Sequence, residues 1–261
     1  MELGIQGKVA LVLASSRGLG QAMAVSLARE GVKVAVTGRN PDGLKESVQM
    51  IEAAGGTALA LSWDLSDVSL IDAMVSRVEK ELGPIDILIN NTGGPPPTTA
   101  AGQDPALWQK SFNDMVTTLL SITDRVLPGM RERKWGRIIT STTSGAIAPI
   151  KNLAISNTLR AALLAWSKTL SAEVANQGIT VNVIMPGRVA TDRLRQLDEA
   201  RAKRENTSYE LVVQDSLKQI PAGRYGDPRE YGDTAAFLAS QNASFITGSV
   251  IRVDGGQIQA I

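Results

Sequence analysis

The stretch Val9-Ala10-Leu11-Val12-Leu13-Ala14-Ser15-Ser16-Arg17-Gly18-Leu19-Gly20 decides how the rest of the chain is interpreted. It joins a short apolar run, typical of a buried strand, to a glycine-containing turn and then to a segment of helical period, Leu19 to Glu30. Such a turn lets the backbone approach a pyrophosphate and points the first amides of the helix toward it. Two glycines at a helix start also serve close packing, so the position in the first strand-to-helix turn is what favours binding. We therefore predict that Ser15 to Gly20 hold a dinucleotide.

Short apolar runs recur along the chain and alternate with segments of helical period, such as 41–54 and 69–82. The further runs are Val32–Val36, Ala58–Leu61, Ile85–Ile89, Arg137–Thr140, Ile179–Ile184 and Val250–Val253. Nearly continuous apolar runs are expected of strands that are buried on both faces of a parallel sheet. The alternation implies repeated βαβ units in a doubly wound α/β fold of the Rossmann type. No linker-like segment interrupts it, so we expect a single domain over residues 1–261.

The chain has 261 residues, of which 43% are hydrophobic and 20% charged, which is typical of a soluble protein with a sizeable core. Lys and Arg number 27 against 26 Asp and Glu, so the net charge gives no basis for binding nucleic acid or an anionic membrane. No apolar run approaches the ~18 residues of a membrane span, and we expect a cytoplasmic protein.

Cysteine and histidine are both absent from the sequence. The absence of cysteine excludes a disulfide framework, a thiol nucleophile and Cys-ligated zinc. The absence of histidine excludes every His-dependent triad and the commonest general base near neutral pH. We predict no metal site.

The second apolar run ends in Thr37-Gly38-Arg39-Asn40. A dinucleotide fold that prefers NAD places an acidic residue here to bind the ribose 2′-hydroxyl, whereas Arg39 suits a 2′-phosphate. Arg17 supplies a second cation nearby. We therefore predict NADP(H) as the cofactor in preference to NAD(H), the alternative being two solvated surface arginines.

An insertion at 190–222 breaks the alternation of strands and helices. It is rich in charge, and it contains a second helix that opens with Thr207-Ser208-Tyr209-Glu210, a capping-box pattern. A long segment after the carboxyl end of a strand lies where open α/β sheets bind ligands. We interpret it as a substrate lid, the alternative being a solvated excursion.

Further motifs make the chain resemble the classical short-chain dehydrogenase/reductase family, in particular its 3-oxoacyl-ACP-reductase-like members, over essentially the full length. Asn90-Asn91-Thr92-Gly93 resembles the family's Asn-Asn-Ala-Gly, and Pro186-Gly187-Arg188-Val189-Ala190-Thr191 resembles its Pro-Gly segment. Arg224 to Pro228 and Val253 to Gly256 resemble its closing signature. Each motif is short, but their order and spacing together make the resemblance specific.

The resemblance implies a seven-stranded sheet in the order 3-2-1-4-5-6-7, a small-molecule substrate and a homo-oligomer, either a tetramer or a dimer. It places Asp64 and Leu65 near the adenine. It places Asn91, Thr92, Gly93, Pro186, Gly187, Val189 and Thr191 along the remainder of the cofactor site. The apolar residues Leu159, Leu163, Trp166 and Leu170 share helical spacing, and they are interpreted as core or as a subunit interface.

The same comparison shows where the chain departs from the family pattern. The family phrase Tyr-Ser-Ala-Ser-Lys is Ser156-Asn157-Thr158-Leu159-Arg160 here, so Ser replaces the catalytic Tyr and Arg replaces the Lys. The family Ser falls on Thr143, or on Thr142 or Ser144 if the loop shifts by one residue. The family Asn falls on Met115, and the first glycine of the turn is Ala14.

These replacements change the chemistry that the site supports. In the family mechanism a phenol with a lowered pKa donates a proton to the carbonyl oxygen as hydride arrives at the carbon. A serine hydroxyl is a far weaker acid, and Arg stays protonated with a pKa above ~12. Ser156 and Arg160 still share one helix face, so they can position an oxygen. We predict Thr143, Ser156 and Arg160 as the catalytic set, with Arg160 also holding the nicotinamide ribose or clamping an anion.

The proton must then come from Tyr209, Tyr225, Tyr231, a carboxyl group, a lysine elsewhere or water. Arg188 is interpreted either as a substrate anchor or as a surface charge. The leading hypothesis is an NADP(H)-dependent oxidoreductase that acts on a carbonyl or alcohol with an atypical active site. The alternatives are a nucleotide- or ligand-binding protein that has lost catalysis, and an enzyme of non-redox chemistry on the same scaffold.

Overall fold

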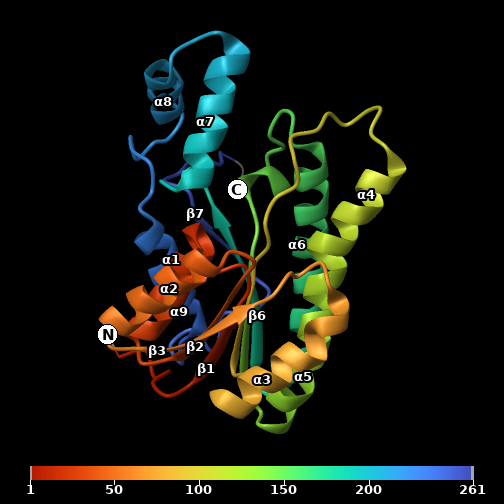
Figure 1. Ribbon diagram of the computed structural model, residues 1–261, viewed down its shortest axis with the longest axis vertical. Coiled ribbons are helices and arrows are strands. Elements are labelled where there is room, and N and C mark those ends of the chain that lie inside the picture. The colour runs from red at the N-terminus through yellow and green to blue at the C-terminus, as the bar shows by residue number, and fades with distance from the viewer. Residues whose placement is uncertain (1, 260–261) are drawn as a thin grey trace.

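A single twisted sheet of seven parallel strands forms the centre of the molecule (Figure 1). The structure, a computed structural model, describes residues 2–259; residues 1, 260 and 261 of the predicted domain lie outside that range. The strand order is β3-β2-β1-β4-β5-β6-β7, which confirms the predicted α/β fold and topology. The strands are β1 (Val9–Val12), β2 (Lys33–Gly38), β3 (Thr57–Ser62), β4 (Ile87–Asn90), β5 (Gly136–Ser141), β6 (Ile179–Pro186) and β7 (Val250–Val253).

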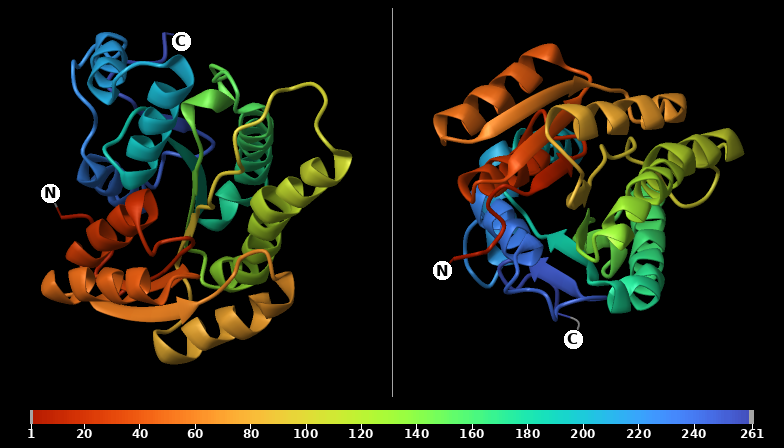
Figure 2. Two further views of the ribbon diagram at one scale, coloured as in Figure 1. Left: turned by 45° about the horizontal axis from the view of Figure 1, so that its top comes forward. Right: turned by 90° about the horizontal axis from the view of Figure 1, so that it is seen from below.

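Helices cover both faces of the sheet (Figure 2). One face carries α1 (Gly18–Arg29), α2 (Pro41–Ala53) and α9 (Pro228–Ala239), and the other carries α3 (Ile71–Glu81), α5 (Thr118–Glu132) and α6 (Ala154–Val174). The remaining α-helices are α4 (Pro105–Phe112), α7 (Asp192–Glu205) and α8 (Tyr209–Lys218). The central strands β1, β4, β5 and β6 are buried along their whole length, which is why they read as apolar runs, whereas the edge strands β3 and β7 are partly exposed.

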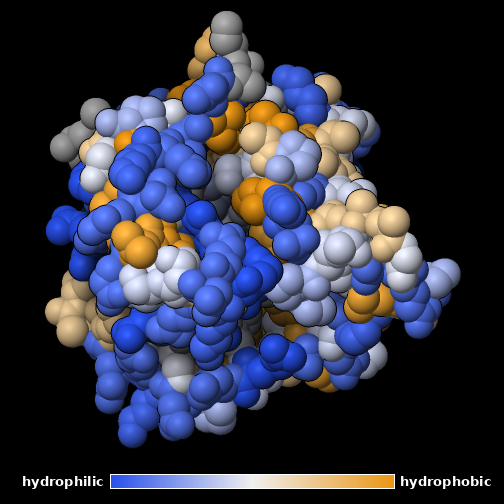
Figure 3. Space-filling view, turned by 90° about the horizontal axis from the view of Figure 1, so that it is seen from above, coloured by the Kyte–Doolittle hydropathy of each residue, from blue (hydrophilic) through white to orange (hydrophobic). Residues whose placement is uncertain are grey.

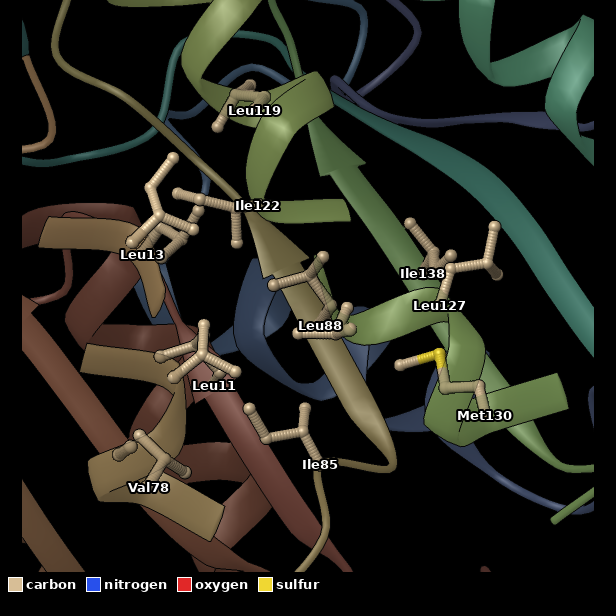
Figure 4. Close-up of a cluster of buried hydrophobic side chains, with 14 of the residues drawn as sticks. Leu11, Leu13, Val78, Ile85, Leu88, Leu119, Ile122, Leu127, Met130 and Ile138 are labelled. Carbon is tan, nitrogen blue, oxygen red and sulfur yellow. The ribbon is translucent and has the colours of Figure 1, made fainter. Parts of the chain in front are cut away.

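The hydrophobic core beneath α3, α5 and α6 is shown in Figure 4. Leu88 of β4 and Ile138 of β5 point toward Ile122 and Leu127 of α5, which follow helical spacing. Leu159, Leu163 and Leu170 of α6 are buried in this same core within one chain, so core is the correct interpretation for them, and Trp166 packs against its edge.

Element ends differ from the predicted ones by one or two residues where backbone hydrogen bonding, and not polarity, decides them. β3 includes Thr57 and Ser62 because they pair with Lys33 and Gly38 of β2. The segment predicted as one helix over 69–82 begins instead with a 3₁₀ turn, Val68–Leu70, in which the carboxylate of Asp67 accepts a hydrogen bond from the amide of Ser69.

A single turn of π-helix, Asn113–Thr117, joins α4 to α5. The hydroxyl of Thr118 donates to the carbonyl of Asn113 and to that of Leu65, so the widened turn is tied to the loop after β3. Met115, predicted to stand at the position of the family Asn, lies in this turn and is buried in the core. A thioether there fills space and offers no strong hydrogen bond.

The insertion at 190–222 forms α7 and α8, which stand above the carboxyl edge of the sheet (Figure 1). The predicted capping box at Thr207 and Glu210 is wrong, because the residue that caps α8 is Ser208, whose hydroxyl accepts a hydrogen bond from the amide of Leu211. The helix therefore starts one residue later than predicted. Its third residue is Leu211, whose apolar side chain cannot accept the second hydrogen bond of a capping box.

The close packing of α1 on α9 gives a stability prediction. A Cβ on Gly232 would lie 2.5 Å from both the carbonyl oxygen of Ala22 and the hydroxyl of Ser26, so Gly232→Ala forces the helices apart. We expect the free energy of unfolding to fall by about 2 kcal/mol, as measured by chemical denaturation. Gly94→Ala, which adds a Cβ in open space, is the matched control, and equal stability of the two variants would contradict this packing.

Candidate active site

The predicted site residues gather at one edge because all strands are parallel and end on the same side. The turn after β1, Arg39 after β2, Asn91 after β4, Thr143 after β5 and Gly187 after β6 all lie there. Figure 3 looks down on this edge, which is mostly hydrophilic and hollowed near its middle, with a few hydrophobic residues around the hollow.

The turn after β1 is held by hydrogen bonds within the sheet. The hydroxyl of Ser15 donates to the carbonyl of Val12 at 2.7 Å and accepts from the amide of Thr37 at 2.9 Å, while the amide of Ser15 donates to the carbonyl of Thr37 at 2.8 Å. Ser15 is fully buried, so its side chain shapes the turn and does not extend into the cleft. The predicted contact of Ser15 with the dinucleotide stays a prediction.

A close approach explains the second glycine of the turn. A Cβ on Gly20 would collide with the carbonyl oxygen of Ala14 and lie 2.9 Å from the amide nitrogen of the Asn91 side chain. That nitrogen donates to the carbonyls of Leu13 and Ala14, both at 3.2 Å, and so fastens the end of β1 to the end of β4. Gly20 and Asn91 therefore act together on the geometry of the turn.

Ala14 has a φ of 47°, a left-handed conformation that glycine adopts without strain. The family pattern has glycine at this position, and the methyl group of Ala14 costs on the order of 1 kcal/mol there. The bonds from Asn91 hold the strained residue in place. Gly18, in the same turn, has a φ of 60°. Ser16 packs against Gly38. Arg17 directly precedes α1, and Leu19 lies in its first turn.

Arg39 and Asp64 lie at the ends of neighbouring strands, with 3.8 Å between the guanidinium and the carboxylate. The Arg39 side chain is 78% exposed, so it is accessible to a ligand and its ion pair contributes little to stability. Hydrogen bonds from the amide and hydroxyl of Ser66 lower the pKa of Asp64, with a smaller contribution from Arg39. The structure thus brings together Arg39, predicted at the 2′-phosphate, and Asp64, predicted near the adenine.

Arg160 is buried, and its guanidinium joins two strand ends. Nη1 donates to the carbonyl of Ser141 at 2.9 Å, and Nη2 donates to the carbonyls of Thr92 at 3.1 Å and Gly93 at 3.4 Å. Burial lowers the pKa of Arg160. The sequence predicted that Arg160 binds a ribose or an anion. These carbonyl partners were not predicted, because they are backbone groups and no side-chain pattern indicates them.

Several hydroxyl groups belong to the segments that follow β4 and β5 and to α6, the elements that Arg160 connects. Thr92 and Thr142 are both buried, and neither hydroxyl has a hydrogen-bond partner among residues 2–259. Thr143 caps a short 3₁₀ turn, Ser144–Ala146, which packs on α6. Ser156 on α6 is partly buried and its side chain makes no hydrogen bond within the described range. Buried hydroxyls without partners are uncommon and indicate a polar ligand or water at this place.

The segment after β6 is packed against the strand beside it. A Cβ on Gly187 would lie 2.6 Å from the Cα of Asp254, and Val189 pairs with Gly226. Pro186 is the last residue of β6, and Thr191 caps α7 by accepting from the amide of Leu194.

Arg188 was predicted as a substrate anchor or a surface charge, and the structure shows it paired with a buried carboxylate instead. Its Nη1 lies 2.6 Å from a carboxylate oxygen of Asp198 on α7, and the other oxygen of Asp198 accepts a hydrogen bond from the hydroxyl of Tyr225 at 2.8 Å. Asp198 is 1% exposed, so Arg188 neutralises a buried charge and is committed to that partner. Sequence reasoning missed Asp198 because nothing distinguishes it within the charged run of the insertion.

The three tyrosines are not arranged as proton donors to Ser156. The hydroxyl of Tyr231 is fully buried, lies 2.9 Å from the Ser141 hydroxyl and donates to the carbonyl of Ile184, and burial raises its pKa. Burial and Asp198 raise the pKa of Tyr225. Tyr209 lines a groove on the outer side of α1. Ser141 and Tyr231 are 90 residues apart in the sequence, so no local pattern predicts their contact.

A parallel α/β sheet with a glycine turn after its first strand, set against the ends of its neighbours, defines a Rossmann-type dinucleotide-binding protein. More narrowly, the chain belongs to the classical short-chain dehydrogenase/reductase family of oxidoreductases. Residues 13–257 match the family described as Enoyl-(Acyl carrier protein) reductase.

Individual relatives agree with this assignment. Acetoacetyl-CoA reductase of Shinella zoogloeoides is 34% identical over 250 residues, covering 96% of this chain and 98% of the relative. The 3-oxoacyl-(acyl-carrier-protein) reductase FabG of Escherichia coli K12 is 34% identical over 261 residues, covering 97% and 98%. The L-sorbose reductase of Gluconobacter frateurii, solved with NADPH and L-sorbose, is 32% identical with a TM-score of 0.93 and covers 100% of both chains. Within residues 2–259, no helix is long and apolar enough to cross a membrane.

The buried hydroxyl of Tyr231 gives a pH-dependent stability prediction. Its pKa is raised above 10.0 in the folded protein, so its contribution to folding is complete below pH 10.0 and is lost as the pH rises beyond that value. Tyr231→Phe leaves Ser141 without its partner and should lower the free energy of unfolding by about 1–2 kcal/mol below pH 10.0. Urea denaturation should show the difference from wild type shrinking above that pH.

Tyr209→Phe is the control for this measurement, because the hydroxyl of Tyr209 has no hydrogen bond within the described part of the chain. A Tyr231→Phe difference that stays constant across the same alkaline range would contradict the assignment of a raised pKa to Tyr231.

Proposed function

We propose that this protein is an NADP(H)-dependent oxidoreductase that interconverts a carbonyl and an alcohol in an active site without a dedicated proton donor. The observation that carries the cofactor assignment is the exposed guanidinium of Arg39 at the end of β2, where an acidic residue would favour NAD. The solved complex of the related L-sorbose reductase with NADPH supports the same choice.

The residues present fit such a cofactor. Gly18 leaves the backbone of the turn accessible, Gly20 allows the turn to pack closely on the start of α1, and Asn91 holds the turn against β4. The unpartnered hydroxyls of Thr92 and Thr142 offer hydrogen bonds at the other end of the cleft. When bound, the nicotinamide supplies or accepts the hydride. We assign Arg39 and Asp64 to the adenosine end, and the 186–191 segment to the nicotinamide end.

The chemistry at the substrate oxygen then falls to this chain's own hydroxyls. Ser156 and Thr143 orient the oxygen, while Arg160 holds the strand ends that surround it. With Tyr225 and Tyr231 engaged in buried hydrogen bonds, water is the proton source that we favour. Acid–base assistance is typically worth ~10²–10⁴-fold, so turnover should be slow by that order. We also propose that residues 190–222 act as a substrate lid and that the protein is a homo-oligomer.

A second function, nucleotide binding without turnover, is favoured by one specific observation. Both terminal nitrogens of Arg160 donate to backbone carbonyls, so this residue does structural work where the family pattern has its lysine. One experiment distinguishes an oxidoreductase from a protein that only binds the nucleotide. An oxidoreductase consumes NADPH with at least one member of a broad carbonyl panel, whereas a binding protein binds NADPH and consumes none.

Replacing Arg39 tests the cofactor. Arg39→Ala should weaken NADPH binding about tenfold or more, because it removes a charge-assisted contact to the 2′-phosphate, and should leave NADH binding unchanged. Fluorescence or calorimetric titration measures both affinities. Arg77→Ala, an exposed arginine on α3, is the control. Equal weakening of NADPH and NADH by Arg39→Ala would reject the 2′-phosphate assignment.

Removing the two hydroxyls tests the site. Ser156→Ala and Thr143→Val should each lower kcat for carbonyl reduction about tenfold, since each removes a hydrogen bond to the reacting oxygen, while the Kd for NADPH stays unchanged. Thr158→Ala, on the exposed side of the same helix, is the matched control. Unaltered kcat in both site variants would show that these hydroxyls do not touch the substrate.

A further inference from the structure

A second concave region lies on the outer side of α1, away from the sheet. It has a volume of about 540 Å³ and is formed by α1, the start of α9 and the two-helix segment α7–α8, with Met50 of α2 at one end. We call it the outer groove and define it by Val25, Arg29, Arg195, Tyr209, Tyr225 and Arg229 among its lining residues. Its volume falls within the roughly 300–1,000 Å³ range of small-molecule sites.

The outer groove is separate from the proposed active site. Of the residues predicted to bind the dinucleotide, only Gly18 and Thr191 border it. Arg39, Ser156 and Arg160 do not line it. Val25 and Arg29 follow Gly18 along the helix, so the groove runs away from the glycine turn toward the far end of α1.

The lining combines apolar surface, aromatic rings and cations. Ala22, Val25 and Pro228 supply apolar surface, and Tyr209 and Tyr225 supply the two rings. Polar and charged side chains, among them Gln21, Asp192 and Arg195, lie between these apolar and aromatic groups, and such a mixture suits a flat amphipathic molecule.

The charges on the lining favour an anion. Arg29 is exposed and makes no hydrogen bond or ion pair within residues 2–259, whereas Arg195 pairs with Glu199 and Arg229 pairs with Asp233. Two carboxylates face the same groove. Asp192 lies in the first turn of α7, and Asp227 is occupied as the cap of α9, where it accepts from the amide of Arg229. Within residues 2–259, Arg29 and Asp192 are the lining charges without a hydrogen-bond or ion-pair partner, and the three guanidinium groups of the lining outnumber its two carboxylates by one.

We propose that the outer groove binds a small aromatic anion, a ligand with a flat apolar body and one carboxylate or sulfonate group. The rings of Tyr209 and Tyr225 contact the apolar body, and Arg29 receives the negative group. This site does not depend on the chemistry proposed for the active site.

Tyr225 links the groove to the insertion. Its ring lines the groove, while its hydroxyl donates to the buried Asp198 of α7, which Arg188 neutralises. A ligand that immobilises the ring of Tyr225 therefore favours the position of α7 seen in the structure. By linkage, whatever holds α7 in this position also strengthens binding in the groove.

The probe for this site is 1-anilinonaphthalene-8-sulfonate, and its uncharged counterpart is N-phenyl-1-naphthylamine, which lacks only the sulfonate. Both become fluorescent when buried, so titration measures both affinities. Arg29→Gln should weaken the sulfonate probe about tenfold and leave the uncharged probe unchanged. Arg193→Gln, on an exposed residue of α7 outside the groove, should change neither. Equal weakening of the two probes by Arg29→Gln, or an effect of Arg193→Gln as large as that of Arg29→Gln, would overturn the proposal.

Two further measurements separate the groove from the cofactor cleft and test the link to α7. Saturating NADPH should leave the sulfonate probe bound, and competitive displacement would place the probe in the cleft and overturn the proposal. The bound probe should slow hydrogen exchange of α7 amides in wild type. In Tyr225→Phe, which keeps the ring and loses the bond to Asp198, the probe should bind without slowing that exchange. Equal protection in both proteins would remove the proposed link.

Discussion

The geometry of the candidate site depends on the guanidinium of Arg160, which holds the ends of β4 and β5 together through the carbonyls of Ser141, Thr92 and Gly93. A buried cation is costly unless hydrogen bonds compensate it, and here strand-end carbonyls compensate it in place of a carboxylate. β4 and β5 pair directly as far as Asn90 and Thr140, and Arg160 of α6 extends this connection to the loops that carry Asn91 and Thr143. The network continues from Ser141 to Tyr231 of α9, which packs on α1 through Gly232.

This arrangement suits arginine and does not suit lysine. A planar fork presents several donors in fixed directions and reaches carbonyls on two strands at once, whereas an ammonium is a single point on a flexible stem. The same commitment limits what Arg160 does for a substrate, because its terminal nitrogens already face the backbone. Stability of the strand ends and proton chemistry at the substrate thus compete for one position in this chain.

The fold was predictable to a large extent, and the site only in outline. Apolar runs and the glycine turn are local patterns, and they predict seven strands of a parallel sheet and the edge where the site lies, while the order of the strands came from the resemblance to the family. The ion pair Arg188–Asp198 could not be predicted, because the sequence around Asp198 is that of an ordinary charged surface helix. The bonds of Arg160 end on main-chain oxygens, which every residue has, and the Ser141–Tyr231 contact joins distant elements. Such features arise from tertiary packing, so sequence periodicity carries no trace of them.

The burial of Asp198 has a kinetic consequence for the segment that carries it. For α7 to move away from the sheet, Asp198 must leave Arg188 and Tyr225 together, because one carboxylate holds both. In the intermediate positions the charge has lost its partners without yet gaining full hydration, so the movement crosses a barrier and does not proceed by gradual drift. The single buried carboxylate of Asp198 thus resists the departure of the whole segment and not of one side chain alone.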